Sequence, residues 1–447
     1  MSGSIDVAGE LDYSQRPVPP SGRMPKLNLT MAFWAICSAM FFLIISATLA
    51  EIYGTANTII GLILTVISYS AINAVITRYA IRSGLSVSLF SRLLFGRYGS
   101  AIATFIYAVS SIYYAVFEGS VIATAATYYF EGLTFAVAAL IVCIYSVPLI
   151  LGSVQHWLDK FNGYLLPLYL LGLMGTVIYA ISHYGYSNAW LTMTPDGGAP
   201  PYGWINVFIA FMGVWWMMMC TFDFARFGKK EDENYHAVFN FGLPFYTLTY
   251  FVNGLVGIFL VQTIPLEGAT SEVSVVKALI VMMGALGLLF VWISQTRINT
   301  TNFYLSTVNM QAFFRLVFKL EMPKYVWAII VGVIVYFVML ANIFQYLLVA
   351  LAYQGIFVVA WVGVALAYIL CGQHDGTGED AARPDDDFPA YYAPGMIAWF
   401  GAVGIGIVLL VIPQLELLSA PATVISSFLL FWALSTRTMV AGAAYQR

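Results

Sequence analysis

Long apolar runs recur along nearly the whole chain, and they constrain its fold more than any other feature. One of them, ALIVMMGALGLLFVWIS, extends from Ala278 to Ser294 without a charged side chain. A helix needs roughly 20 mostly apolar residues to cross the hydrocarbon core of a bilayer, and the chain offers about a dozen such runs. Only 9% of the residues are charged, whereas a soluble domain has about a quarter. The sequence therefore predicts an all-α integral membrane protein.

The runs predict about twelve transmembrane helices. A polar segment rich in proline and glycine precedes the first run, and it lacks the compact apolar core and cleavage site of a signal peptide. We therefore expect residues 1–31 to form a disordered cytosolic tail. The predicted spans are 32–54, 58–78, 100–130, 134–153, 161–183, 204–222, 239–263, 277–303, 326–342, 345–370, 394–412 and 420–440.

The positions of lysine and arginine predict how these helices are oriented. If the amino terminus is cytosolic, all but two of the 19 lysines and arginines fall in cytosolic segments or at cytosolic helix ends. The exceptions are Lys277, at an outer helix end, and Arg297, inside a helix. Because positive residues gather on the cytosolic side, we expect a multi-pass protein of the inner or plasma membrane with both termini in the cytosol. The acidic stretch 374–387 is then a cytosolic loop.

The composition disfavours several kinds of partner and site. The net charge of −3 is small and scattered, so no basic surface for nucleic acid is expected. No two of the four cysteines form a CxxC pair, and the four histidines lack the spacing of metal ligands. Both observations argue against disulfides and structural zinc. No histidine lies in the interior of a span, and the sequence has neither HExxH nor a GxSxG in a suitable position. We therefore predict no enzyme activity and no cofactor.

The third predicted span carries a polar stripe that ends in a carboxylate. Tyr107, Ser111, Tyr114 and Glu118 are spaced at 0, 4, 7 and 11 residues and share one helical face. The tyrosines and the serine alone would also suit a packing face held by hydroxyl groups. A charge at the centre of a bilayer costs roughly 2.5–3.5 kcal/mol, so a buried carboxylate is a functional candidate. Glu118 therefore favours a binding site.

The stretch QTRINTTNFY places amides and an arginine where the eighth span should continue. Gln295, Asn299 and Asn302 lie on one helical face, and Arg297 points in nearly the opposite direction. Amides offer paired donors and acceptors, which match the N–H and C=O edges of a planar heterocycle. The alternative is interhelical hydrogen bonding, worth about 0.6 kcal/mol for each bond. Three amides in register favour a ligand site, with a cation offered to a neighbouring helix.

The sixth predicted span contains a glycine beside two tryptophans. Gly213 precedes Trp215 and Trp216 in the middle of an apolar run. The pattern fits simple packing, which this span alone favours. It also fits a broken helix that brings an indole against a flat ligand, because aromatic stacking gains roughly 0.5–1.5 kcal/mol beyond area burial.

Three segments resemble the nucleobase:cation symporter family, the bacterial and fungal permeases for purines, cytosine, uracil, hydantoins and allantoin. RSGLSVSLFSRLLFGRYGS, residues 82–100, is similar to that family's loop after the second helix. DFARFGKK, residues 223–230, resembles the segment at the cytosolic end of its helix six. QTRINTTNFY resembles its eighth-helix pattern. Together with the predicted spans, the likeness covers nearly the whole chain except the tail and the acidic loop.

The resemblance implies the leucine-transporter-type fold. In that fold two inverted repeats of five helices each begin with a helix that is broken at the bilayer midplane, and helices three and eight flank the breaks. In the first helix we expect the break within FFLIISATLA, residues 41–50. The implied organisation is 1–31 for the tail, 32–183 for helices 1–5, 204–370 for helices 6–10, 371–393 for the acidic cytosolic loop and 394–440 for helices 11 and 12.

The resemblance also implies which residues contact the substrate. Tyr114 stands where the family often has a stacking tryptophan, and Glu118 stands where it has a hydrogen-bonding glutamine. Trp215 is the expected aromatic residue of helix six, with Val214 as the alternative alignment. The remaining contacts that it implies are Phe42 on helix one and Ser294, Gln295 and Asn299 on helix eight. Asn302 is expected to join them mainly because it shares their helical face.

One departure from the family pattern concerns the coupling ion. Sodium-coupled relatives carry hydroxyl groups where this chain has Arg297 and Ile298. A guanidinium is a cation without an acceptor atom, so it cannot ligate sodium, and its fixed charge can take over the electrostatic role of the ion. We therefore expect no sodium at this position and a proton-coupled or facilitative mechanism, with Glu118 as the candidate proton carrier.

The predicted function is uptake of a nucleobase, above all a purine or a related N-heterocycle, by alternating access. An ionised Glu118 accepts two parallel hydrogen bonds, as the adjacent N–H donors of guanine or of an amidine would supply. The expected partners are this small molecule, protons and the lipid bilayer. A transporter of the same fold for a cationic N-heterocycle, an amino acid, a polyamine or a vitamin precursor remains an alternative. An ion channel is more remote, because it should show repeated pore loops or rings of one charge sign. The oligomeric state is left open.

Overall fold

A computed structural model describes residue 13 and residues 16–151, 159–265, 273–341, 346–372 and 387–445, with the side chains of the last helix described to residue 436. Helices dominate this part of the chain. They are α1 (Lys26–Phe33), α2 (Met40–Tyr53), α3 (Thr55–Ser83), α4 (Val87–Tyr129), α5 (Phe135–Leu149), α6 (Asp159–Tyr184), α7 (Gly203–Met212), α8 (Trp216–Ala225), α9 (Glu233–Tyr235), α10 (Leu243–Tyr246), α11 (Asn253–Thr263), α12 (Ser274–Met283), α13 (Ala285–Phe318), α14 (Lys324–Met339), α15 (Leu347–Cys371), α16 (Ala393–Val411) and α17 (Ser419–Tyr445).

The predicted class, a helical multi-pass membrane protein, is confirmed. Among the described residues, 8 helices or nearly continuous helical runs are long and apolar enough to cross a bilayer, or up to 9 when the bent pair α7 and α8 is counted as one span. Three shorter apolar helices, α5, α12 and α14, add to them. Within the described residues, every predicted span overlaps one helix or a run of consecutive helices; 239–263, for example, covers α10, α11 and the π-helical turns beside them.

Two predicted boundaries at the start of the chain were wrong. Helix α1 begins at Lys26, inside the range expected to be a tail, and the backbone N–H of Met24 donates to the Phe227 carbonyl at 2.7 Å. The break in the first membrane helix spans Trp34–Ala39, whereas residues 41–50, where we expected it, lie inside the continuous helix α2. Part of the predicted tail, residues 1–12 and 14–15, and most of the acidic loop, residues 373–386, lie outside the described residues.

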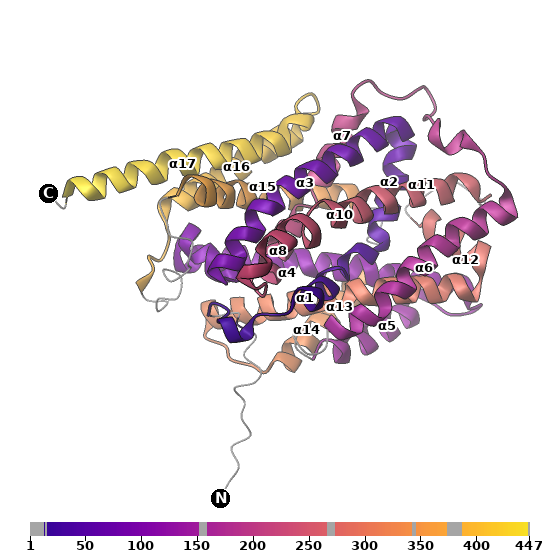
Figure 1. The fold of residues 1–447 in the computed structure, drawn as a ribbon, viewed down its shortest axis with the longest axis horizontal. Coiled ribbons are helices and arrows are strands. Elements are labelled where there is room, and N and C mark those ends of the chain that lie inside the picture. The colour runs from indigo at the N-terminus through magenta and orange to yellow at the C-terminus, as the bar shows by residue number, and fades with distance from the viewer. Residues whose placement is uncertain are drawn as a thin grey trace, which may run out of the picture.

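The helices form one bundle around two long central members (Figure 1). Helices α4 and α13, the third and eighth spans, pack against each other along much of their length. Helices α16 and α17 lie together along one edge of the bundle and pack on α15, while α5, α6, α12 and α14 lie toward the other side (Figure 1). The two helices with predicted polar faces are therefore at the centre of the fold, and the two C-terminal helices are peripheral.

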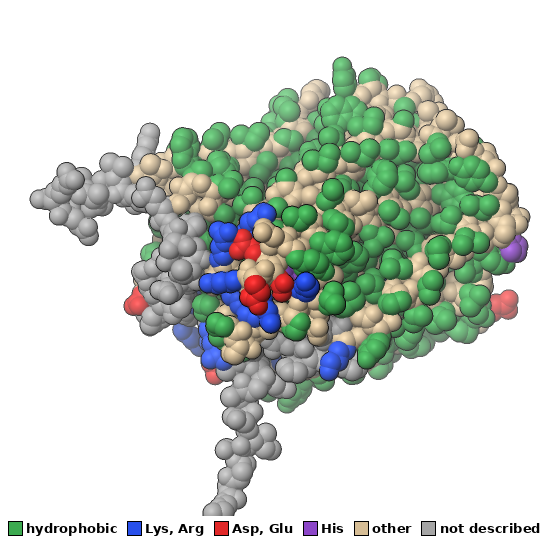
Figure 2. Space-filling model, in the orientation of Figure 1, with side chains coloured by type: hydrophobic (Ala, Val, Ile, Leu, Met, Phe, Trp, Pro, Cys, Tyr) green, Lys and Arg blue, Asp and Glu red, His purple; other side chains and the backbone are tan. Residues whose placement is uncertain are grey.

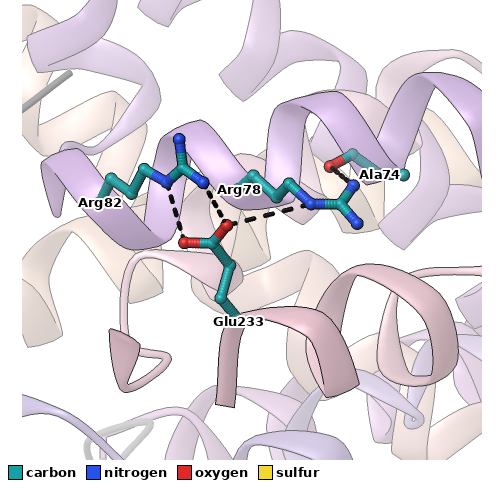
Figure 3. A network of polar contacts seen from close by, with 4 residues as sticks. All are labelled: Ala74, Arg78, Arg82 and Glu233. Carbon is teal, nitrogen blue, oxygen red and sulfur yellow. Dashed lines mark hydrogen bonds and ion pairs between the residues drawn. The ribbon is translucent and has the colours of Figure 1, made fainter. Parts of the chain in front are cut away.

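The surface separates into a broad apolar area and a charged end. Figure 2 shows hydrophobic side chains over most of this face, with the charged side chains gathered around the ends of α1 and α8. At that end Arg82 of α3 donates two hydrogen bonds to Glu233, at 2.9 and 2.7 Å, and Arg78 lies 3.9 Å from the same carboxylate (Figure 3). Such partly exposed pairs contribute little stability. They mark the end of the molecule that we expect to be cytosolic.

Two of the segments that carry the family resemblance contact each other at this charged end. The backbone N–H of Val87, in the segment 82–100, donates to Asp223 of DFARFGKK at 2.8 Å. Phe90 stacks on Phe222, with 4.6 Å between ring centroids. Gly96 kinks α4 with a φ of 78°, and a Cβ there would lie 2.6 Å from the Pro389 carbonyl oxygen. The segment therefore folds back over the end of α8, and glycine is required at its bend.

Candidate functional site

The carboxyl-terminal end of α1 faces a buried arginine. Arg297 is fully buried, and its Nη2 donates to the Trp34 carbonyl at 2.9 Å. Its guanidinium carbon lies 5.6 Å from the centroid of the Tyr169 ring. The Trp34 carbonyl also accepts from the Cys37 thiol at 3.0 Å. A helix carries partial negative charge at its last carbonyls, so the guanidinium compensates the end of α1 and gains a cation–π contact.

The amino-terminal end of α2 faces a buried carboxylate and an amide. The Met40 N–H donates to Gln295 Oε1 at 2.9 Å, and the Phe41 N–H donates to the Glu118 carboxylate. Gln295 Nε2 donates to Glu118 Oε2. Glu118 and Gln295 are both buried. The first N–H groups of a helix carry partial positive charge and lack intrahelical acceptors, so these two side chains satisfy and compensate them.

Further side chains hold the residues of the break itself. Ser38 and Ser294 exchange hydrogen bonds, each hydroxyl donating to the other residue's carbonyl, at 2.9 and 2.6 Å. The Cys37 carbonyl accepts from Asn253 Nδ2 at 2.6 Å, and the Tyr169 hydroxyl donates to Asn253 Oδ1 at 2.7 Å. The broken segment is thus fixed mainly by α13 and α11, which meets the need of buried backbone groups for partners.

The sixth span is broken as well. Helices α7 and α8 are bent by 44° across Gly213, Val214 and Trp215. The Phe211 carbonyl, near the end of α7, accepts from the Tyr69 hydroxyl at 2.6 Å. A Cβ on Gly355 of α15 would lie 2.6 Å from the Cα of Gly213. The alternative of a broken helix, rather than simple packing, is the one observed, and Gly213 allows α15 to approach the break closely.

A small cavity lies between the two breaks. It is lined by Ile36 and Ala39 of the first break, Val214 of the second, and side chains of α2, α4, α8 and α13: Phe41, Phe42, Tyr114, Glu118, Trp216, Met217, Ile298 and Asn302. The rings of Tyr114 and Trp216 are 4.7 Å apart and tilted by 39°. The free space is about 10 Å³, roughly what one water needs. A planar ring can therefore enter only if the two aromatic walls separate.

Buried polar groups without partners point toward this cavity or lie close to it. Both amide atoms of Asn302, which lines the cavity, have no hydrogen-bond partner among the described residues, and neither does Trp216 Nε1. The Tyr114 hydroxyl accepts a long bond, 3.4 Å, from Gln354 Nε2. Leaving a buried donor or acceptor unsatisfied costs about 1–3 kcal/mol. Asn302 and Trp216 therefore supply donors and an acceptor that a polar ligand would satisfy.

Solved structures with the same arrangement of helices are membrane transporters. Mhp1, a nucleobase-cation-symport-1 family transporter, crystallised closed with bromovinylhydantoin, is similar over 94% of both chains with a TM-score of 0.75 and 15% identity. MhsT in complex with L-phenylalanine gives 0.59 at 14% identity over 92% of this chain and 99% of that one. A manganese transporter of Eremococcus coleocola gives 0.58 at 13% identity over 94% of this chain and 97% of that one. No protein-family model and no curated protein matches the sequence.

The chain has the leucine-transporter-type fold. The fold that the resemblance implied is thereby confirmed. In transporters of this fold the substrate and ion sites lie at the broken helices, and the cavity of this chain also lies between its two breaks.

The structure brings several of the predicted site residues together and separates others. Tyr114, Glu118, Phe42 and Asn302 line the cavity. Gln295 and Ser294 lie behind it, bonded to Glu118 and to Ser38, and Asn299 is buried without lining it. Arg297 lies on the opposite side of α13, at the end of α1.

The helix-six aromatic residue at the cavity is Trp216 and not the expected Trp215. Trp215 lies against Tyr69, with 6.5 Å between centroids at 90°, and does not line the cavity, whereas Trp216 does. Residues 213–215 form tight turns between the two half-helices, and the resemblance on which the expectation of Trp215 rested does not include this local geometry. The alternative, Val214, also lines the cavity but offers no ring.

The sequence reasoning also missed residues that close the cavity. Phe41 packs edge-on against Tyr114, with 5.6 Å between centroids, and Ile36 and Ala39 come from the break itself. The short run AICSA, residues 35–39, consists mostly of small residues between apolar aromatic segments. That change in side-chain size was the available signal for the break.

Proposed function

We propose that this protein is a secondary transporter that moves a planar N-heterocycle, a nucleobase or a close relative, across the membrane by alternating access. The observation that carries the proposal is the cavity between the breaks. It combines two facing rings, Tyr114 and Trp216, with a carboxylate, Glu118, and an amide without a partner, Asn302. Rings recognise the faces of a flat ligand, and the amide and carboxylate recognise its N–H and C=O edge.

The similar solved structures support this class of substrate to different degrees. The structure of Mhp1 contains bound bromovinylhydantoin, which has a planar ring with N–H and C=O groups, and its TM-score of 0.75 exceeds the 0.58 of the manganese transporter. The manganese transporter would suggest a metal ion as cargo. However, the described residues contain no group of three or more His, Cys, Asp or Glu side chains that could hold a metal ion. The aromatic and amide side chains that line the cavity therefore favour a heterocycle as the cargo.

We further propose that transport does not depend on sodium. The guanidinium of Arg297 sits at the carbonyl end of α1, bonded to Trp34 and beside Cys37. A fixed cation there compensates the helix end that a bound cation would otherwise compensate. The mechanism is then proton-coupled or facilitative. Glu118, a buried carboxylate that lines the cavity, is the proposed proton carrier.

The first experiment is a thermal-shift scan of the purified protein. Guanine, hypoxanthine, adenine, cytosine, uracil, hydantoin and allantoin are added singly, each in sodium and in potassium buffer. A ligand stabilises the folded state by RT ln(1 + [L]/Kd). We expect at least one of these rings to raise the melting temperature equally in both buffers. Trp216→Ala removes one ring of the cavity and should reduce the shift, while Trp215→Ala is the matched control and should retain it. The absence of a shift by every ring, or shifts only in sodium, would count against the proposal.

A further inference from the structure

Two buried side chains place opposite charges on the two ends of the break in the first helix. Arg297 caps the carbonyl end of α1, and Glu118, with Gln295, caps the amide end of α2. Both come from helices other than the broken one. In leucine-transporter-type folds the amide ends of the broken helices bind the anionic group of a substrate, and the carbonyl ends bind the coupling cation. In this chain both positions are taken by residues of the protein.

We infer that the site selects against substrates that carry a carboxylate, because Glu118 already occupies the anion position at the amino terminus of α2. The inference deepens the proposed function and rests on it for the nature of the cargo. It removes amino acids and other carboxylates from the possible substrates and retains neutral and cationic rings.

The geometry supports the occupation of this position by Glu118 in two ways. The carboxylate accepts from the Phe41 N–H, the second residue of a helix of 14 residues, so it lies where the partial positive charge of α2 is concentrated. The amide of Gln295 is oriented consistently with this, because its Oε1 accepts from Met40 and its Nε2 donates to Glu118. Glu118 is only 1% exposed and still lines the cavity.

The same geometry predicts strong discrimination. A substrate carboxylate in the cavity would lie beside Glu118 and would find the Gln295 Nε2 and Phe41 N–H donors already bonded to Glu118. Burying an anion without such donors is costly in either protonation state of Glu118. Where Glu118 is ionised, two like charges about 4 Å apart at an effective dielectric constant of 20 also weaken the Kd roughly 1000-fold. The Arg297 guanidinium cannot offset it, because it faces the carbonyl end of α1 on the other side of α13.

Chemical rescue by formate tests the inference without any substrate. Glu118→Ala leaves the Phe41 N–H and Gln295 Nε2 without their acceptor. We expect ~100 mM sodium formate to raise the melting temperature of this variant by about 1–3 °C over the same concentration of sodium chloride. The wild type and Glu118→Gln should show no formate-specific rise in melting temperature. The anion position is filled by the Glu118 carboxylate in the wild type and by a neutral amide of similar size in Glu118→Gln. If Glu118→Ala does not fold, Glu118→Ser is measured in its place.

The outcomes separate this inference from the proposed function. A formate-specific rise confined to the alanine or serine variant supports an anion position at α2. A folded variant without that rise, or a wild type that responds equally, overturns it. Neither result depends on whether a nucleobase binds. Conversely, a protein that binds none of the neutral rings but shows the rescue would refute the heterocycle proposal alone.

Discussion

Replacement of Arg297 by serine should create a sodium-responsive protein. The substitution removes the guanidinium from the Trp34 carbonyl and from the Tyr169 ring, and it introduces a hydroxyl group in its place. If the guanidinium stands in for a coupling cation, its removal leaves carbonyl oxygens at the end of α1 that attract one. Thr300 and Thr301, buried one turn further along α13, add hydroxyl groups nearby.

The stability change itself should be modest, because opposing terms nearly cancel. A hydrogen bond from a charged group contributes about 1.5–3 kcal/mol, and a desolvated cation–π contact contributes about 2 kcal/mol. Against these stands the cost of placing the charge within the membrane, about 2.5–3.5 kcal/mol. The net loss on substitution is therefore about 0–2.5 kcal/mol. The variant should fold.

The assay is thermal unfolding of the wild type and of Arg297→Ser in sodium, potassium and choline chloride at equal ionic strength. We expect the wild type to melt at the same temperature in all three. At a sodium concentration ten times its Kd for the variant, sodium stabilises the folded variant by about 1.4 kcal/mol. The melting temperature of the variant should then rise measurably in sodium chloride and not in the other two salts. Arg297→Lys is the control, because it keeps the positive charge while losing the planar fork, and it should remain indifferent to sodium. A wild type stabilised by sodium over potassium would refute the reasoning.

Three further predictions concern the cavity and the second break. Glu118→Gln should weaken the binding of a ring with adjacent N–H donors, such as guanine, by about tenfold or more, since a charge-assisted hydrogen bond is lost. The same substitution should remove the pH dependence of that binding. A titration that shows unchanged affinity and an unchanged pH profile would contradict this. Trp216→Ala should weaken ring binding about 3- to 10-fold beyond the effect of Trp215→Ala, because stacking adds roughly 0.5–1.5 kcal/mol; equal effects of the two substitutions on Kd would be evidence against Trp216 as the cavity wall. Gly355→Ala should destabilise the protein by about 1–3 kcal/mol through overpacking, since its Cβ would lie 2.6 Å from Gly213 Cα. Gly404→Ala in α16 is the control and should not destabilise it, because a Cβ there meets nothing within 4 Å. Equal melting temperatures of the two variants would argue against a close contact of α15 with the break.

The helical faces could be predicted from the sequence because they depend only on helical periodicity. Glu118 and Tyr114 on α4, and Gln295 and Asn302 on α13, keep their relative directions in the structure since both helices are regular there. The separation of Arg297 from the amide face followed from the same arithmetic. Length and apolarity likewise sufficed to predict the membrane helices.

The two breaks could not be placed in the same way, because a break suspends the periodicity. Across Gly213–Trp215 the chain forms tight turns, so the phase of α7 does not carry over to α8 and Trp216, not Trp215, reaches the cavity. The break at Trp34–Ala39 is held by partners distant in sequence, among them Asn253, Ser294 and Gln295. No local pattern announces such partners.

The most direct test of the account is substrate counterflow in proteoliposomes. Vesicles containing the wild type are loaded with an unlabelled ring that raises the melting temperature, such as guanine or hydantoin, and are diluted into the labelled ring in potassium buffer without sodium. The account predicts transient accumulation of label that is unchanged when sodium replaces potassium and reduced in Trp216→Ala vesicles. Accumulation that requires sodium, or none with any of the planar rings, would contradict it.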